Sequence, residues 1–156
     1  LLAGKGSTVA AGGTDLTVAK LRAAKKTLDS NNVPAEDRHI VLHANNLSSL
    51  LSETAVTSAD FNTVRALVSG ELNTFLGFTF HTIGDRAEGG VSIDGSSVRS
   101  CLAFHRSAIG YGEGIGPKTE INYVPEKTSF LVNAMLSACS VGIDGEGIVE
   151  VLADES

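Results

Sequence analysis

Hydrophobic and polar residues follow two different periods along this chain. Between Thr14 and Ser30 apolar residues recur at helical spacing, with lysine and arginine between them. Thr14 is a suitable N-cap, and Pro34 prevents the helix from continuing past the polar residues that precede it. The apolar positions of this pattern are Leu16, Ala19, Leu21, Ala23, Ala24 and Leu28. The pattern predicts a helix over residues 14–30.

Shorter apolar runs predict strands and further helices. The predicted strands are residues 39–43, 76–83, 101–109, 119–124, 128–141 and 148–152. A short helix carrying Leu47, Leu50 and Leu51, capped by Asn45 or Asn46, and a second helix near 57–69 are predicted between the first two strands. Because helices and strands follow in irregular order, the sequence indicates an α+β fold.

Four segments of the second half need separate interpretation. Residues 128–141 contain helix-favouring Ala134, Met135 and Leu136, but we expect a strand because the neighbouring segments are strands. Residues 143–147 predict a hairpin turn into the last strand, and residues 113–117 predict a break in the strand pattern. Residues 84–99 are polar and predict an exposed loop or hairpin.

The chain of 156 residues is long enough for one compact domain or two small lobes. It begins with Leu1 instead of Met, and residues 1–13 are rich in glycine and predict a flexible linker. We therefore expect a processed or truncated chain. The net charge of −6 argues against general nucleic-acid binding. No apolar run approaches the ~18 residues of a membrane span, and no signal peptide is recognised.

The histidines and cysteines offer the main candidates for chemistry. His39 and His43 share a face whether their segment is a helix or a strand, so they could form a two-histidine metal site. Cys101 and His105 could form a thiol–imidazole pair, although four residues of strand span roughly 13 Å. The simpler interpretation is that the histidines are ordinary polar residues at strand ends and that Cys101 and Cys139 are small core residues.

Other motifs are weak. The serines at 107, 129 and 137 lack a nucleophile elbow, and the glycine runs at 3–7 and 110–116 lack the spacing of phosphate or dinucleotide loops. The acidic residues Asp85, Glu88 and Asp94 lack the alternation of a calcium loop. A small basic patch predicted on the first helix is either a solvated face or a contact for acidic groups of a neighbouring subunit; its members are Lys20, Arg22, Lys25 and Lys26.

Four segments, in order, resemble one known family. Residues 32–38 read NVPAEDR, residues 70–78 read GELNTFLGF, residues 101–110 read CLAFHRSAIG, and residues 142–150 read GIDGEGIVE. Each is similar to a motif of the major capsid proteins of tailed phages and prophages. The resemblance runs from about residue 16 to residue 152.

The resemblance implies an α+β fold of the Hong Kong 97 type. It implies peripheral-domain elements in residues 14–43 and 119–156, with the first helix as the spine helix, and axial-domain elements in residues 44–118. The N-terminal arm and the extended loop of the family are expected to be missing. It also implies a structural shell subunit without enzymatic activity, cofactor or metal, which assembles with copies of itself into pentamers and hexamers around a genome.

The implied partners also include scaffolding or portal proteins. Neither a membrane nor a specific nucleic-acid sequence is an expected partner. The implied locations are the virion and, during assembly, the host bacterial cytoplasm. The alternatives are a small metal- or thiol-dependent enzyme that uses His39 and His43 or Cys101 and His105, another virion or adaptor protein, and a capsid-like shell that serves as a cellular compartment.

Overall fold

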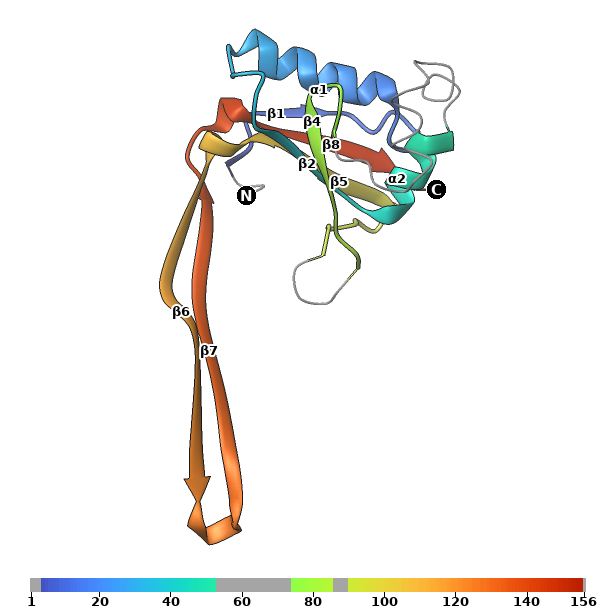
Figure 1. Ribbon diagram of the computed structural model, residues 1–156. Helices are drawn as coiled ribbons and strands as arrows, with labels where there is room; N and C mark the ends of the chain where they lie inside the picture. The colour runs from blue at the N-terminus through green and yellow to red at the C-terminus, as the bar shows by residue number, and fades with distance from the viewer. Residues whose placement is uncertain (1–3, 53–73, 86–89, 156) are drawn as a thin grey trace. The chain divides into compact units, whose positions relative to one another are not determined.

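The computed structural model describes residues 4–52, 74–85 and 90–155. The chain divides into two compact units, one drawn from Leu1–Ile109 and Gly142–Ser156, and the other from Gly110–Val141. We call them the sheet unit and the hairpin unit, and each is labelled by its strands in Figure 1. The predicted helix near 57–69 lies outside the described residues.

The described part of the sheet unit contains a six-stranded mixed sheet in the order β1-β8-β5-β2-β4-β3. The strands are β1 (Ser7–Val9), β2 (Arg38–Leu42), β3 (Thr74–Phe75), β4 (Phe78–Thr82), β5 (Val98–His105) and β8 (Ile148–Asp154). The β1–β8 and β2–β4 pairs are parallel, and the others are antiparallel. The helices are α1 (Val18–Ser30) and α2 (Ala44–Ser52). This content confirms the predicted α+β class.

The core lies between α1, α2 and one face of the sheet (Figure 1). Strand side chains alternate between the two faces, so the apolar residues at alternate positions of β2, β4, β5 and β8 enter this core. The buried core residues are Leu16, Leu21, Ala24, Leu28, Ile40, Leu42, Leu50, Phe78, Phe80, Cys101, Ala103, Val149, Val151 and Ala153. The helical and strand periods read from the sequence therefore converge on one apolar layer.

The NVPAEDR segment closes the loop between α1 and β2 through its arginine. Arg38 is 2% exposed, and its guanidinium donates hydrogen bonds to the carbonyl oxygens of Val33 (2.6 Å) and Pro34 (2.7 Å). It also forms an ion pair of 2.7 Å with Asp29, in the last turn of α1. A buried charge needs such partners, which explains why this motif ends in arginine.

The CLAFHRSAIG and GIDGEGIVE segments pack against each other. They hold the 3₁₀ turns η2 (Arg106–Ala108) and η4 (Gly145–Gly147). The Ala108 carbonyl oxygen accepts a hydrogen bond of 2.8 Å from the Ile143 N–H, and a Cβ on Gly147 would lie 2.6 Å from that of Ala108. The small residues in both motifs thus permit close contact, at the two points where the chain enters and leaves the hairpin unit.

The hairpin unit consists mainly of β6 (Ile109–Val124) and β7 (Ser129–Gly142), joined by the 3₁₀ turn η3 (Pro125–Lys127). They form a two-stranded sheet of their own. The expectation that residues 128–141 form a strand is confirmed. The predicted break at 113–117 is wrong, because β6 continues through it. In a two-stranded ribbon, each strand has one edge without a partner. Proline has no backbone N–H and is tolerated in such edge strands, so Pro117 does not end β6.

Three other expectations are corrected. Helix α1 begins at Val18, because Thr17 rather than Thr14 is the N-cap and accepts the Lys20 N–H. Residues 7–9 form strand β1 within the predicted linker, and a Cβ on Gly6 would collide with the Gly145 carbonyl, so this glycine permits close packing. Finally, β8 does not form a hairpin with β7 but pairs with β1 and β5.

The sheet also joins segments that the sequence assigned to different domains. Strand β2, from the predicted peripheral segment, pairs with β4 and β5, both from the predicted axial segment. The correspondence of these segments to the domains of a shell subunit stays a prediction.

Candidate interaction surface

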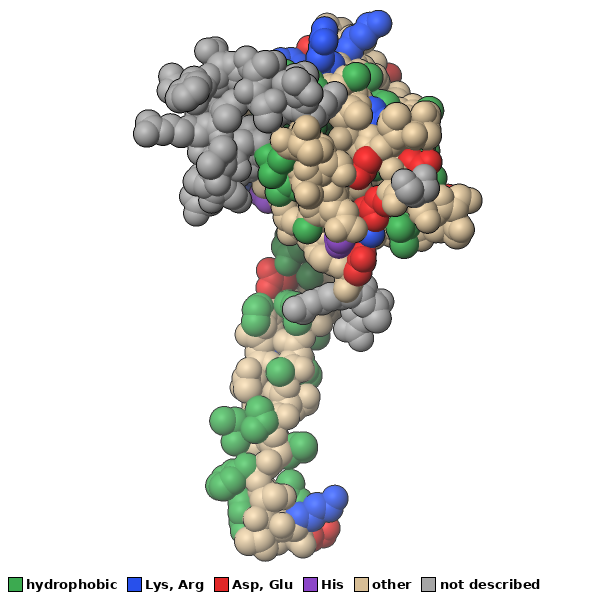
Figure 2. Space-filling view, turned by 90° about the vertical axis from the view of Figure 1, so that its right-hand side faces the viewer, with side chains coloured by type: hydrophobic (Ala, Val, Ile, Leu, Met, Phe, Trp, Pro, Cys, Tyr) green, Lys and Arg blue, Asp and Glu red, His purple; other side chains and the backbone are tan. Residues whose placement is uncertain are grey.

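The hairpin unit exposes large hydrophobic side chains along its length (Figure 2). Nine of them have exposed fractions between 49% and 70%. They are Tyr111, Ile115, Ile121, Tyr123, Phe130, Leu131, Val132, Leu136 and Val141. A two-stranded ribbon has no interior, so it cannot bury these side chains within itself. An apolar surface of this extent is typical of a site that another protein covers.

The charged residues of the same unit lie between residues 113 and 127, and strand β7 carries none. These charged residues are Glu113, Lys118, Glu120, Glu126 and Lys127, and Lys118 forms an exposed ion pair with Glu120 at 2.6 Å. Protein interfaces are depleted of charge in their centres and enriched in aromatic residues. The composition of the hairpin matches that description.

One stretch of the hairpin pairs glycines with small side chains, and another carries aromatic side chains. A Cβ on Gly112 would lie 3.5 Å from the Cys139 sulfur, and one on Gly114 would lie 3.5 Å from the Ser137 hydroxyl, so the glycines face small side chains of β7. Elsewhere along the strands, the rings of Tyr123 and Phe130 lie 5.2 Å apart. We call the exposed apolar residues of β6 and β7 the hairpin surface.

The two-histidine site considered as an alternative for His39 and His43 is not formed. The His39 Nδ1 atom instead lies 3.1 Å from the Nε2 atom of His81, on the neighbouring strand β4. Burial, and then the charge of His81, lowers the pKa of His39. His43 follows the end of β2, and its Nε2 atom lies 3.6 Å from the Asp85 carboxylate. Sequence reasoning missed His81, although alternation with buried Phe80 places it on the opposite face of the sheet.

Cys101 and His105 each have a different partner. Cys101 is fully buried, its thiol contacts the Asn46 side-chain oxygen at 3.5 Å, and burial raises its pKa to about 12. A thiol of this kind is not a nucleophile at neutral pH. The Nδ1 atom of His105 lies 2.7 Å from the Ser107 hydroxyl and accepts the Ser107 N–H, which caps η2. The other serines considered, Ser129 and Ser137, lie in β7.

The acidic residues considered for calcium have structural partners, apart from Glu88, which lies outside the described residues. Asp85 forms an ion pair of 2.6 Å with Arg99, which is itself 2% exposed and also pairs with Glu155 at 2.6 Å. Asp94 accepts the backbone N–H groups of Ser96 and Val98 in a turn. Among the described residues, no group of three or more metal-ligating side chains is found.

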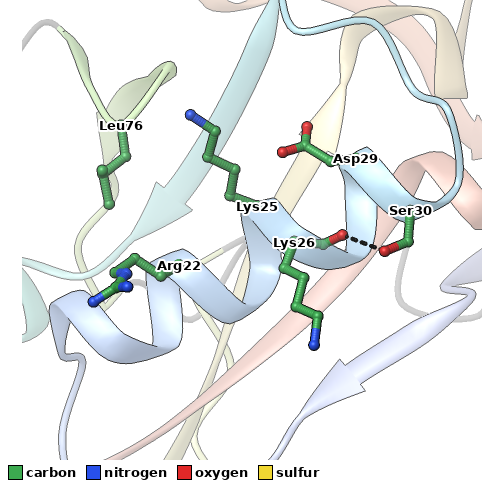
Figure 3. A pocket seen from close by; sticks show the side chains of 6 residues that line it. All are labelled: Arg22, Lys25, Lys26, Asp29, Ser30 and Leu76. Carbon is green, nitrogen blue, oxygen red and sulfur yellow. Dashed lines mark hydrogen bonds between the residues drawn. The ribbon is translucent and has the colours of Figure 1, made fainter.

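The basic patch of the first helix is smaller than predicted. Lys20 is buried and donates hydrogen bonds to the carbonyl oxygens of Thr14 and Leu152, so it does not belong to the patch. The other three cations line a shallow pocket, shown in Figure 3; its lining is Arg22, Lys25, Lys26, Asp29, Ser30 and Leu76. Because Asp29 is paired with Arg38, the pocket keeps a positive charge.

Comparison with known proteins identifies the family. The family described as phage capsid protein matches residues 2–155. The chain belongs to this family. Among curated proteins, none matches the sequence significantly. The resemblance to tailed-phage major capsid proteins, drawn from four short segments, is therefore confirmed at the level of the family.

Solved capsid structures share the fold. A structure titled Mycobacterium phage Che8 is 22% identical, with a TM-score of 0.69, and the alignment covers 96% of this chain and 54% of that one. The capsid structure of the cyanophage P-SCSP1u is 21% identical (TM-score 0.63; 96% and 53% covered). The head structure of Helicobacter pylori bacteriophage KHP40 is 12% identical (TM-score 0.67; 97% and 61% covered). This phage capsid protein thus spans little more than half the length of the Che8 and P-SCSP1u chains.

Within the part of the chain that the structure describes, no helix is both long enough and apolar enough to cross a membrane.

Proposed function

We propose that this chain is a structural part of a phage or prophage capsid, and that it associates with copies of itself in the icosahedral shell around the genome. Closed shells are built from repeated copies of one surface in quasi-equivalent positions. The copies are expected in rings of five and six. The protein is expected in the virion and, during assembly, in the cytoplasm of the bacterial host.

The observation that carries this proposal is the hairpin surface. Its nine large apolar side chains are each at least 49% exposed, and the described strands β6 and β7 offer two long edges whose backbone groups have no further strand partner. Free strand edges pair readily with other chains. Many weak contacts of this kind, repeated over a shell, add up to high stability through multivalency.

The candidate catalytic residues support a structural rather than an enzymatic role. The thiol of Cys101 is buried against Asn46, and the imidazole of His105 caps a turn with Ser107. The candidates therefore do not converge around a common point where a substrate could react. We propose that no cofactor takes part in the function.

The finer assignments rest on the family resemblance. We propose that residues 14–43 and 119–156 contribute to a peripheral domain and residues 44–118 to an axial domain. We also propose scaffolding or portal proteins as further partners. We do not propose a membrane or a specific nucleic-acid sequence as a partner. The positive pocket on α1, with Arg22, Lys25 and Lys26, supports contact with acidic groups of a neighbouring subunit.

Electron microscopy of the protein expressed from its complete gene tests the proposal. We expect closed shells, or rings of five and six subunits, in negative stain. The double variant Phe130→Ser/Leu136→Ser, at two exposed positions of β7, is expected to reduce assembly strongly, because it removes apolar area from the interface.

The matched control is Ile93→Ser, which changes an apolar residue of the sheet unit that is 47% exposed. This variant is expected to assemble like the unchanged protein. A monodisperse monomer of the complete protein at high concentration would contradict the proposal. Equal assembly of both variants would show that the hairpin surface is not the interface.

A further inference from the structure

The sheet face opposite α1 carries a pair of histidines that the capsid role does not explain. His39 of β2 and His81 of β4 lie on this face, because their strand neighbours Ile40 and Phe80 point into the core. His39 is partly buried beside the Phe104 ring, at a centroid distance of 5.7 Å, whereas His81 is exposed. The pair is therefore accessible from solvent and is held on regular strands.

The geometry of the two rings is close to that of two imidazoles on one metal ion. The His39 Nδ1 and His81 Nε2 atoms lie 3.1 Å apart, and the ring centroids lie 5.2 Å apart. On a tetrahedral ion with bonds of about 2.0–2.1 Å to nitrogen, the two nitrogens would be about 3.3 Å apart and the centroids about 5 Å. The spacing of the two nitrogens and of the two rings is therefore compatible with a shared ion.

We propose that His39 and His81 bind a borderline divalent cation, of the class of Zn²⁺, Ni²⁺ and Cu²⁺, in a two-imidazole site. Imidazole nitrogen is a preferred ligand of these ions. In the ion-free protein, one ring donates a hydrogen bond to the other. To bind the ion, the donor ring takes its other tautomer, so that its proton lies on the ring nitrogen that faces away from the ion. Both facing nitrogens then present lone pairs, and water completes the coordination shell of the ion.

The site would act as a cross-link within the sheet. Strands β2 and β4 form a parallel pair, and within the described residues the strand on the other side of β4 is β3, which has two residues. An ion held by one side chain from each strand binds the folded sheet better than the unfolded chain, so it stabilises the fold by mass action. This inference concerns the sheet unit alone and does not depend on shell assembly.

Titration calorimetry with ZnCl₂ and NiCl₂, on the chain without a polyhistidine tag, tests the inference. We expect one saturable ion per chain and a rise in Tm at saturation. His81→Ala is expected to weaken affinity by about tenfold or more, because a single imidazole remains. His81 is exposed, so this variant is expected to fold, and His81→Gln provides an independent second replacement.

The control variant is His43→Ala, which also leaves three histidines but removes the ring that faces Asp85. It is expected to retain the affinity of the unchanged chain within about twofold. Absence of saturable binding by the unchanged chain would overturn the inference. So would an equal loss of affinity in the His43 and His81 variants, since that would assign the binding to histidine content rather than to this pair.

Discussion

Buried polar side chains of the sheet unit are matched with partners from distant parts of the sequence. Arg99 joins Asp85 and Glu155, and Asn46 donates hydrogen bonds to Asp15 (2.7 Å) and Glu155 (2.9 Å). This network connects β5, α2 and the end of the chain. Because buried ions are costly without partners, each member of such a network depends on the others.

Removing Arg99 is expected to destabilise the sheet unit. Arg99→Met leaves two carboxylates without their cation, and we expect the free energy of unfolding to fall by about 3 kcal/mol. Urea denaturation measures this value. Arg106→Met removes the same charge from an exposed side chain and is expected to change stability little. An equal loss of stability in both variants would show that the burial of Arg99 does not determine its contribution.

The same network predicts loss of stability in acid. Hydrogen bonds from Arg99 lower the pKa of Glu155 below its ordinary value of 4.5. The stabilisation from this carboxylate is therefore present above pH 4.5 and is lost as the pH falls through the lower pKa of the folded state. We expect a flatter decline in Glu155→Gln than in the unchanged protein when stability is measured between about pH 6 and 3. Identical slopes would exclude this contribution.

The two cysteines are expected to differ in reactivity. Cys101 is fully buried with a pKa raised to about 12, as a core residue, whereas Cys139 is exposed on β7, so its interpretation as a core residue is wrong. Iodoacetamide at pH 8 is expected to modify the folded, unassembled chain at Cys139 and to spare Cys101 until denaturant is added. Mass spectrometry of the labelled peptides measures this. Comparable labelling rates for the two thiols would contradict the burial of Cys101.

Among the elements, the turn between β3 and β4 depends on backbone conformation. Leu76 and Gly77 both have positive φ, +54° and +85°, as a tight hairpin turn with right-handed strand twist requires. Glycine tolerates this region, and leucine does so only at a cost. The contact of Leu76 with the core therefore holds this residue in its positive-φ conformation.

Substitution of Gly77 measures the free-energy cost of a positive φ in this turn. A Cβ at Gly77 would meet no atom within 4 Å, so Gly77→Ala is expected to cost about 1 kcal/mol through the positive φ alone. Gly95 has equally open surroundings and no such φ, so Gly95→Ala is expected to be neutral or slightly stabilising. Thermal unfolding distinguishes the two. Equal shifts would show that the turn conformation carries no strain for alanine.

In the whole molecule, the hydrophobic core and the proposed assembly surface belong to different units. The core belongs to the sheet unit, and its chain ends at the hairpin are close, because Ala108 accepts the Ile143 N–H. We expect the sheet unit to fold when residues 110–141 are replaced by a short Gly-Ser linker. Cooperative urea unfolding and the amide NMR spectrum test this.

The same deletion is expected to abolish self-association, since it removes the hairpin surface. Sedimentation of the complete protein carrying the deletion measures the loss. A deleted chain that remains unfolded would show that the hairpin is part of the folding core. A folded deletion that still forms shells would place the interface elsewhere.

Local patterns of the sequence determined much of this protein. The strand at 39–43, the helix with Leu47 and Leu50, and the strand character of 128–141 all follow from short-range periodicity and propensity. The four family segments were also readable, and the structure gives a reason for part of them, since Arg38 closes a loop and Ala108 packs on Gly147. The spacing of apolar residues indicates which side of a core helix or strand is buried, and this spacing can be read from the sequence without the structure.

Pairing between distant segments was decided only by the tertiary structure. Strand β8 pairs with β5 and β1 instead of its chain neighbour β7, and His39 faces His81 instead of His43. The exposure of the hairpin surface is likewise invisible to periodicity, because the same apolar strand is expected in a core and on an unpartnered ribbon. Partners separated by tens of residues are chosen by the packing of the whole sheet, and no local pattern encodes that choice.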